Sequence, residues 1–89
     1  MLESSATIIN KLGLHARAAA KLVSTASAFS SKVKISFNGK EVDGKSIMSV
    51  MMLAAAQGSE IVLKVDGDDE QRALDAILEL INDYFGEGE

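Results

Sequence analysis

The sequence predicts an α+β fold with helices packed on one face of a sheet, because strand-like and helix-like segments alternate along the chain. Apolar and polar residues alternate in residues 32–37 and 60–65, which is typical of strands with one buried face. Residues 16–27, and a segment that starts within 66–70 and runs to Phe85, instead repeat apolar residues with helical spacing. The expected order of elements is β-α-β-β-α-β-α.

The first elements are a short strand and a helix joined by a loop. Residues 6–10 are rich in β-branched side chains and predict a strand. Residues 11–14 contain a glycine and predict a loop. A helix is expected over 16–27, because four apolar residues follow the i, i+3, i+4, i+7 pattern of a buried face. These residues are Ala19, Leu22, Val23 and Ala26.

The middle of the chain predicts a β-hairpin followed by a short helix. Val33, Ile35 and Phe37 would face the core from one strand. Asn38-Gly39 then predicts a tight turn, because a type I′ turn needs positive φ at both positions. Residues 40–43 return as the partner strand, and Ser46 is expected to cap a helix that runs to about residue 55.

The last elements are a strand and a longer helix. Ile61, Leu63 and Val65 would lie on the buried face of residues 60–65. Acidic residues at 66–70 suit the start of a helix, where the helix dipole favours negative charge. The expected apolar stripe of this helix is Leu74, Ile77, Leu78, Ile81 and Phe85, with Gly86 as its stop.

Length and composition favour one domain spanning residues 1–89. The chain has no cysteine and one histidine, so neither a disulfide nor a metal site is expected. Residues 1–7 do not resemble a secretory signal, and the apolar run at 50–56 is too short to cross a membrane. We therefore expect a cytoplasmic protein without a cofactor.

Charge is distributed unevenly along the chain. Residues 1–45 hold seven Lys or Arg and three Asp or Glu, whereas residues 66–89 hold one Arg and nine Asp or Glu. The net charge of −4 argues against a nucleic-acid partner, because a single basic patch would have to neutralise its phosphates. The acidic end is interpreted as maintaining solubility, while the basic part could receive a single phosphoryl group.

His15 is the candidate for chemistry, because it directly precedes the helix predicted at 16–27. Unpaired N–H groups at a helix start can bind an anion, and their positive charge favours an uncharged, nucleophilic imidazole. Arg17 could bind phosphate oxygens and Lys21 would add positive charge. Gly13 would let a donor protein approach closely. The spacing alone equally allows a structural histidine.

Two motifs resemble those of a known family. Gly-Leu-His-Ala-Arg at 13–17, followed by Ala-Ala-Ala-Lys-Leu-Val, is similar to the active-site segment of HPr, the bacterial histidine phosphocarrier family of the phosphoenolpyruvate phosphotransferase system. Gly-Lys-Ser-Ile-Met-Ser-Val-Met at 44–51 resembles the regulatory serine segment of that family. Length and element order also match, over essentially the whole chain.

The resemblance implies an open-faced β-sandwich with antiparallel strands in the order 1-4-2-3. It implies that Nδ1 of His15 accepts a phosphoryl group from enzyme I and passes it to a histidine of a IIA-type protein. Arg17 would stabilise the phosphorylated form, and the amides of Ala16 and Arg17 would hold its oxygens. Ala18 stands where the family commonly has proline, but alanine also favours a helix start. Such a carrier is a transferase component, not a stand-alone enzyme.

An apolar surface is expected beside His15. The helix after Ser46 has almost no polar face, so part of it should be exposed, and methionine adapts to differently shaped partners. Val50 and Leu53 are expected in the core. The candidate partner-binding residues are Leu14, Ala20, Ile47, Met48, Met51 and Met52.

Ser46 has a second possible role. The resemblance implies that an HPr kinase/phosphorylase could phosphorylate it, as in some relatives, and a phosphate there would slow docking of an acidic partner. Capping of the helix is the structural role.

Several alternatives remain at this stage. The carrier could serve sugar uptake or the nitrogen-related branch, and the entry to the helix at 16–27 is somewhat closer to the NPr-like relatives. A non-catalytic interaction module would dock through Met48 and Met51 but would need neither His15 nor Arg17. An RNA-binding domain would need aromatic side chains on the open sheet face, whereas the strands place lysine and glutamate there. A monomer that does not insert into membranes is expected.

Overall fold

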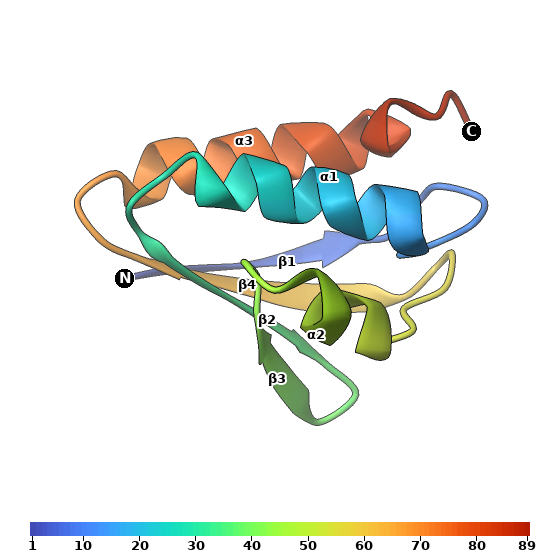
Figure 1. Ribbon diagram of the computed structural model, residues 1–89, viewed down its shortest axis with the longest axis horizontal. Helices are drawn as coiled ribbons and strands as arrows, with labels where there is room; N and C mark the ends of the chain where they lie inside the picture. Colours follow the sequence, from blue (N-terminus) through green and yellow to red (C-terminus); the bar gives the residue numbers. More distant parts are fainter.

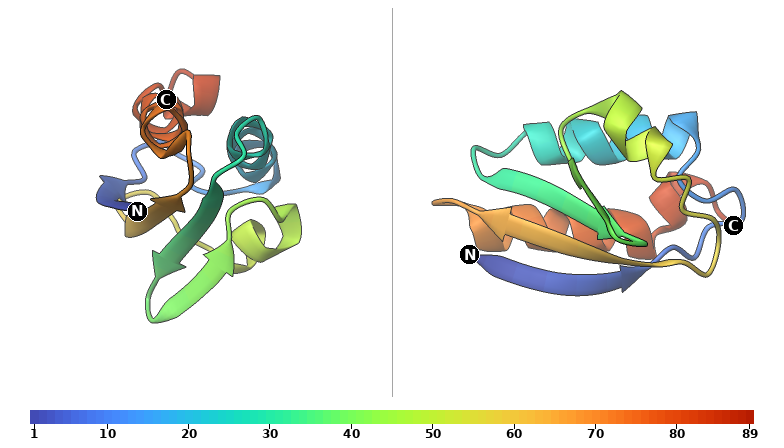
Figure 2. Two further views of the ribbon diagram at one scale, coloured as in Figure 1. Left: turned by 90° about the vertical axis from the view of Figure 1, so that its left-hand side faces the viewer. Right: turned by 90° about the horizontal axis from the view of Figure 1, so that it is seen from below.

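The structure is a computed structural model that describes residues 1–89, with four strands in one antiparallel sheet ordered β1-β4-β2-β3. The strands are β1 (Leu2–Thr7), β2 (Lys32–Phe37), β3 (Lys40–Asp43) and β4 (Glu60–Asp66). The helices are α1 (Ala16–Ser27), α2 (Ile47–Met52), α3 (Glu70–Asn82) and the 3-10 turn η1 (Tyr84–Gly86). All helices cover one face of the sheet and leave the other open (Figures 1 and 2). The predicted fold class and strand order are confirmed.

One apolar core lies between the sheet and the helices. The predicted buried faces of β2 and β4 are confirmed, since Val33 is 1% exposed and Ile35, Ile61, Leu63 and Val65 are fully buried. The predicted stripe of α1 is confirmed as well, with Ala18 added to it. Burying the alternate residues of a strand fixes its register, because a shift by one residue would turn every apolar side chain outward.

No helix of the structure has the length and apolar character needed to cross a membrane.

The first strand was predicted too late in the chain. It covers Leu2–Thr7 rather than 6–10, because pairing with β4 runs from Leu2 opposite Val65 to Thr7 opposite Glu60. Ile8 is still held by backbone hydrogen bonds to Gly58 and Ser59. Most residues of this strand are polar or not β-branched, so its own composition does not indicate a strand.

Two helices end earlier than predicted, each at residues with positive φ. Helix α2 stops at Met52 and is followed by Ala54 with φ of 53°. Helix α3 stops at Asn82, and Tyr84 and Phe85 turn the chain with φ of 57° and 53°. This turn returns the side chain of Phe85 to the core, where it is fully buried.

A polar cluster fastens the molecule at the end where α1 finishes and α3 begins. The carboxylate of Asp69 accepts hydrogen bonds from the backbone N–H groups of Ser30 and Ser31, at 2.9 and 3.0 Å, and from both hydroxyls. These bonds, above all the one from the Ser31 hydroxyl, lower the pKa of Asp69 from 3.8 to about 2. The predicted acidic helix start is therefore also a link between two loops.

Candidate functional site

His15 occupies the N-cap position of α1, as predicted, with φ of −77° and ψ of 179°. No side chain caps this helix, and its first internal bond runs from Ala19 N–H to the His15 carbonyl at 2.8 Å. The amides of Ala16 and Arg17 make no hydrogen bond within the protein. The imidazole, 27% exposed, thus lies beside amides that are free to bind an anion.

The loop before His15 is held by the connection between α2 and β4. Gly13 is buried with φ of +68°, and a Cβ placed on it would lie 2.6 Å from the carbonyl oxygen of Ala55. Leu14 N–H donates to that same oxygen at 2.9 Å. The expected reason for Gly13 is therefore wrong: its lack of a side chain admits this connection, not a donor protein.

Arg17 is exposed and makes no hydrogen bond or ion pair. It lines a surface hollow of about 380 Å³, together with His15. The rest of the lining is Lys11, Leu12, Gly86, Glu87 and Glu89. Lys21 donates to the carbonyl of Phe85 at 2.7 Å, and its positive charge acts on this hollow as expected, since it helps to lower the pKa of Glu87. The guanidinium of Arg17 is thus an unpaired cation in the same hollow as the imidazole, and Lys11 supplies a second one.

Glu87 contacts His15 directly, which sequence reasoning missed. Nε2 of His15 and Oε2 of Glu87 form a hydrogen bond, and Asn10 Nδ2 donates to Oε1 of Glu87 at 3.0 Å. Burial raises the pKa of Glu87, but the hydrogen bonds from His15 and Asn10 outweigh it, so the pKa lies below its ordinary value. Part of the acidic end therefore belongs to the site rather than to the solvated surface.

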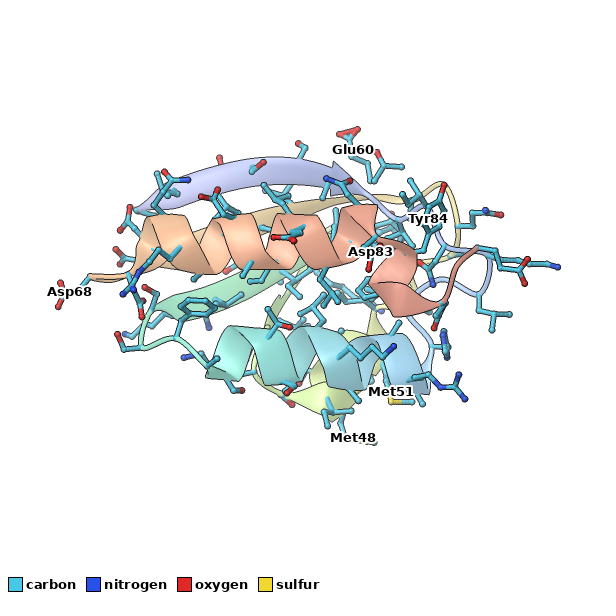
Figure 3. All side chains as sticks on the ribbon, turned by 90° about the horizontal axis from the view of Figure 1, so that it is seen from above. Met48, Met51, Glu60, Asp68, Asp83 and Tyr84 are labelled. Carbon is cyan, nitrogen blue, oxygen red and sulfur yellow. The ribbon has the colours of Figure 1, made fainter.

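The expected apolar surface forms on α2. Met48 and Met52 are 69% and 71% exposed, and Ile47 and Met51 are also exposed. Figure 3 shows Met48 and Met51 beside α1, on the side away from α3. We call Ile47, Met48, Met51 and Met52 the α2 surface.

Leu14 does not extend the α2 surface. Its side chain is 4% exposed and packs in the core, because the loop bond to Ala55 turns it inward. Ala20 is exposed, as expected. Leu12, which sequence reasoning passed over, is 67% exposed in the hollow beside His15. Its position in a short polar loop gave no signal of a role.

The cap at Ser46 is confirmed, since its hydroxyl accepts from Ser49 N–H at 3.4 Å. Val50 is fully buried and Leu53 is 5% exposed, so both belong to the core as predicted.

An imidazole beside free amides and an unpaired guanidinium can bind an anionic group and accept it on nitrogen.

A family model and curated relatives both match this chain over most or all of its length. The family model described as "PTS HPr component phosphorylation site" matches residues 2–83. The curated phosphocarrier protein HPr of Cupriavidus necator is 63% identical over 89 residues, which is 100% of each chain.

Two solved structures of HPr from Thermoanaerobacter tengcongensis are also similar. The first has a TM-score of 0.94 at 47% identity and covers 98% of each chain. The second, described as an HPr dimer, has a TM-score of 0.79 at 47% identity and covers 98% of this chain and 100% of that one. The fold, the site and these relatives together establish that this chain belongs to the HPr family, the phosphoryl carriers of the phosphotransferase system.

Proposed function

We propose that His15 carries the phosphoryl group, accepting it from enzyme I and passing it to a histidine of a IIA-type protein. The observation that supports this most is the convergence on one hollow of the His15 imidazole, the uncapped start of α1 and the unpaired guanidinium of Arg17. All of these groups come from a single chain, which favours a monomer as the working carrier.

The chemistry requires little more than these groups. The transition state of phosphoryl transfer is loose, so catalysis depends on positioning and on stabilising negative charge. The amides of Ala16 and Arg17 would hold two phosphoryl oxygens, and the Arg17 guanidinium would bind the group from the solvent side. No metal or cofactor is needed to hold a phosphoryl group in this arrangement.

Partners would dock on the α2 surface together with Ala20. The exposed side chains lie beside the start of α1, so a protein that covers them would also reach His15. A carrier must leave each partner quickly, and flexible methionines suit several partner shapes. The curated relatives are named HPr, which favours the general carrier branch over the NPr-like branch. A carrier that draws on phosphoenolpyruvate would work in the cytoplasm.

Phosphorylation of Ser46 by an HPr kinase/phosphorylase would regulate docking. Its side chain is half-buried at the edge of the α2 surface, next to Ile47. A phosphate adds a charge of about −2 at that edge and would repel an acidic partner. A Ser46→Asp variant should therefore accept phosphate from enzyme I more slowly, while Ser46→Asn keeps the wild-type rate. Equal rates for all three proteins would contradict this regulation.

The main experiment measures the adduct. The protein is incubated with phosphoenolpyruvate and enzyme I, and its intact mass is recorded before and after brief acid treatment. We expect one phosphoryl group that is lost in acid, because a phosphorus–nitrogen bond is labile when the nitrogen is protonated. The adduct should be absent from His15→Ala and present in Ser46→Ala.

An acid-stable adduct, or one that persists in His15→Ala, would contradict the proposal. No adduct at all, with a properly folded protein, would favour the alternative of a non-catalytic module that docks through Met48 and Met51.

A further inference from the structure

The chain after α3 returns to the phosphorylation site. Figures 1 and 2 show it running from the end of α3 toward the loop that precedes α1. Phe85 anchors this segment in the core, and Lys21 Nζ holds its carbonyl at 2.7 Å. Lys11 N–H donates to the backbone oxygen of Glu89 at 3.1 Å. Glu87 is therefore held between two fixed points, and its side chain is 10% exposed.

The two oxygens of Glu87 have different partners. Oε2 contacts Nε2 of His15, and Oε1 accepts from Asn10. Asn10 is fully buried, and its Nδ2 also donates to the Gly13 carbonyl at 2.8 Å. Because both partners of Nδ2 can only accept, the orientation of the Asn10 amide is fixed by its surroundings. Asn10 thus links Glu87 to the loop that carries His15.

This contact decides which ring nitrogen carries the proton. The lowered pKa of Glu87 keeps its carboxylate ionised at neutral pH, and an ionised carboxylate only accepts hydrogen bonds. Nε2 must therefore donate its proton to Oε2. In the neutral ring the lone pair is then on Nδ1, which has no hydrogen-bond partner in the protein.

We infer that Glu87, held by Asn10, is a positioning residue that keeps Nε2 of His15 protonated and leaves Nδ1 as the phosphoryl acceptor. This inference rests on the proposed function of His15. The same carboxylate occupies the space at Nε2 and repels an anionic group there, so it favours Nδ1 in two ways.

Glu87 also stabilises the charge that the reaction creates. The Nδ1 lone pair forms a bond to phosphorus, and the bond from phosphorus to the donor breaks, with its electron pair remaining on the donor. The proton stays on Nε2, so the ring becomes positively charged and Glu87 offsets that charge. On transfer to the acceptor, the electron pair returns to Nδ1 and the leaving group is a neutral imidazole rather than an anion.

The test compares three variants of the full-length protein. Glu87→Met removes the acceptor while keeping the side-chain length, and Glu87→Gln keeps an acceptor without the charge. Asp83→Asn is the control, because Asp83 belongs to the same segment and its exposed side chain makes no hydrogen bond (Figure 3). Two quantities are measured: the proton resonance on Nε2 in nitrogen-15-labelled protein, and the rate of phosphorylation by enzyme I.

We expect a downfield, slowly exchanging Nε2 proton in the parent protein and in Asp83→Asn, and its loss in Glu87→Met. The kcat should fall roughly tenfold or more in Glu87→Met, the scale of one hydrogen bond to a charged group, with an unchanged KM. Glu87→Gln should lie between the two. If Glu87 had a merely structural role, its replacement would leave the Nε2 proton resonance in place and would not lower kcat while KM stays the same.

A Glu87→Met protein that retains the resonance, or that matches the kcat of Asp83→Asn, would overturn the inference while leaving His15 as the carrier. A parent protein that takes no phosphoryl group would overturn the proposed function and this inference together.

Discussion

Helix α1 meets an acidic side chain at each of its ends, and the two ends differ in what that side chain binds. Beyond its last turn, Asp69 accepts four hydrogen bonds, all from the backbone and hydroxyl groups of Ser30 and Ser31. At its first turn, Glu87 accepts one bond from Asn10 and one from His15. Both carboxylates come from the strongly acidic last quarter of the chain.

The difference lies in the donors. Serine N–H and O–H groups do not titrate, so the Asp69 end has one stable state over the usual pH range. The Glu87 end contains an imidazole with a nitrogen that makes no hydrogen bond, next to unpaired amides and an unpaired guanidinium. The first arrangement fixes the fold, whereas the second leaves groups available for a reaction.

The largest expected effect tests whether the His15 end is rigid. Gly13→Ala should lower the free energy of unfolding by about 2–4 kcal/mol, because the new methyl group meets the Ala55 carbonyl and the backbone is left-handed there. Gly39→Ala is the matched control, with φ of +82° but open space around it, and should cost about 1 kcal/mol. Urea unfolding measures both.

If the two glycine variants lost equal stability, the loop before His15 would be soft. The contrast between a rigid and a reactive end would then need another explanation, because the reactive groups would no longer be held in place.

The next effect tests the Asp69 end. Folding lowers the pKa of Asp69 from 3.8 to about 2, so its ionised form stabilises the folded state above pH 3.8, and this contribution is lost as the pH falls through about 2. Asp69→Asn should therefore be clearly less stable than the parent at neutral pH. The difference should shrink steadily below pH 3.8.

Urea midpoints measured across this range check the prediction. Asp68→Asn is the control, since its exposed side chain makes no hydrogen bond. A stability loss in Asp69→Asn that stays constant down to about pH 2 would show that the carboxylate charge is not the cause.

The smallest effect on stability is expected on the α2 surface. Met48→Ser should change the free energy of unfolding by about 0.5 kcal/mol or less, because the side chain is 69% exposed. It should nevertheless slow phosphorylation by enzyme I. An exposed residue at the far end, Asp68, should affect neither when changed to Asn. If Asp68→Asn slowed phosphorylation by enzyme I, or if Met48→Ser left that rate unchanged, the α2 surface would not be the docking site that distinguishes the His15 end of the molecule from the Asp69 end.

The fold was largely predictable because local patterns and global packing agree. The alternation of Val33 and Ile35 with lysines, and the helical spacing of Leu22 and Val23, each predicted the face that is buried, while Phe37 is only half-buried at the end of its strand. The first strand was misplaced because its pairing with β4 outweighs its own polar composition. Where α3 ends was also missed, since the left-handed turn at Phe85 is stabilised by burial rather than by a local signal.

The site was only half predictable. His15 and Arg17 are two residues apart, so their proximity follows from the helix start alone. Glu87 lies 72 positions from His15, and only the folded chain brings them together. Asn10 was predicted only as the last residue of a strand, although it is fully buried and its amide donates to two acceptors. The resemblance to a family gave no help with Glu87, because it concerned the segments at 13–23 and 44–51.

The most direct test of the carrier chemistry is to identify the phosphorylated atom. The protein is labelled with nitrogen-15 in its single histidine, phosphorylated with phosphoenolpyruvate and enzyme I, and examined by NMR for coupling between phosphorus and the ring nitrogens. We expect coupling to Nδ1 of His15, with the proton still on Nε2. Coupling to Nε2, or phosphorus bound outside the ring, would contradict a carrier in which Glu87 holds one nitrogen and frees the other.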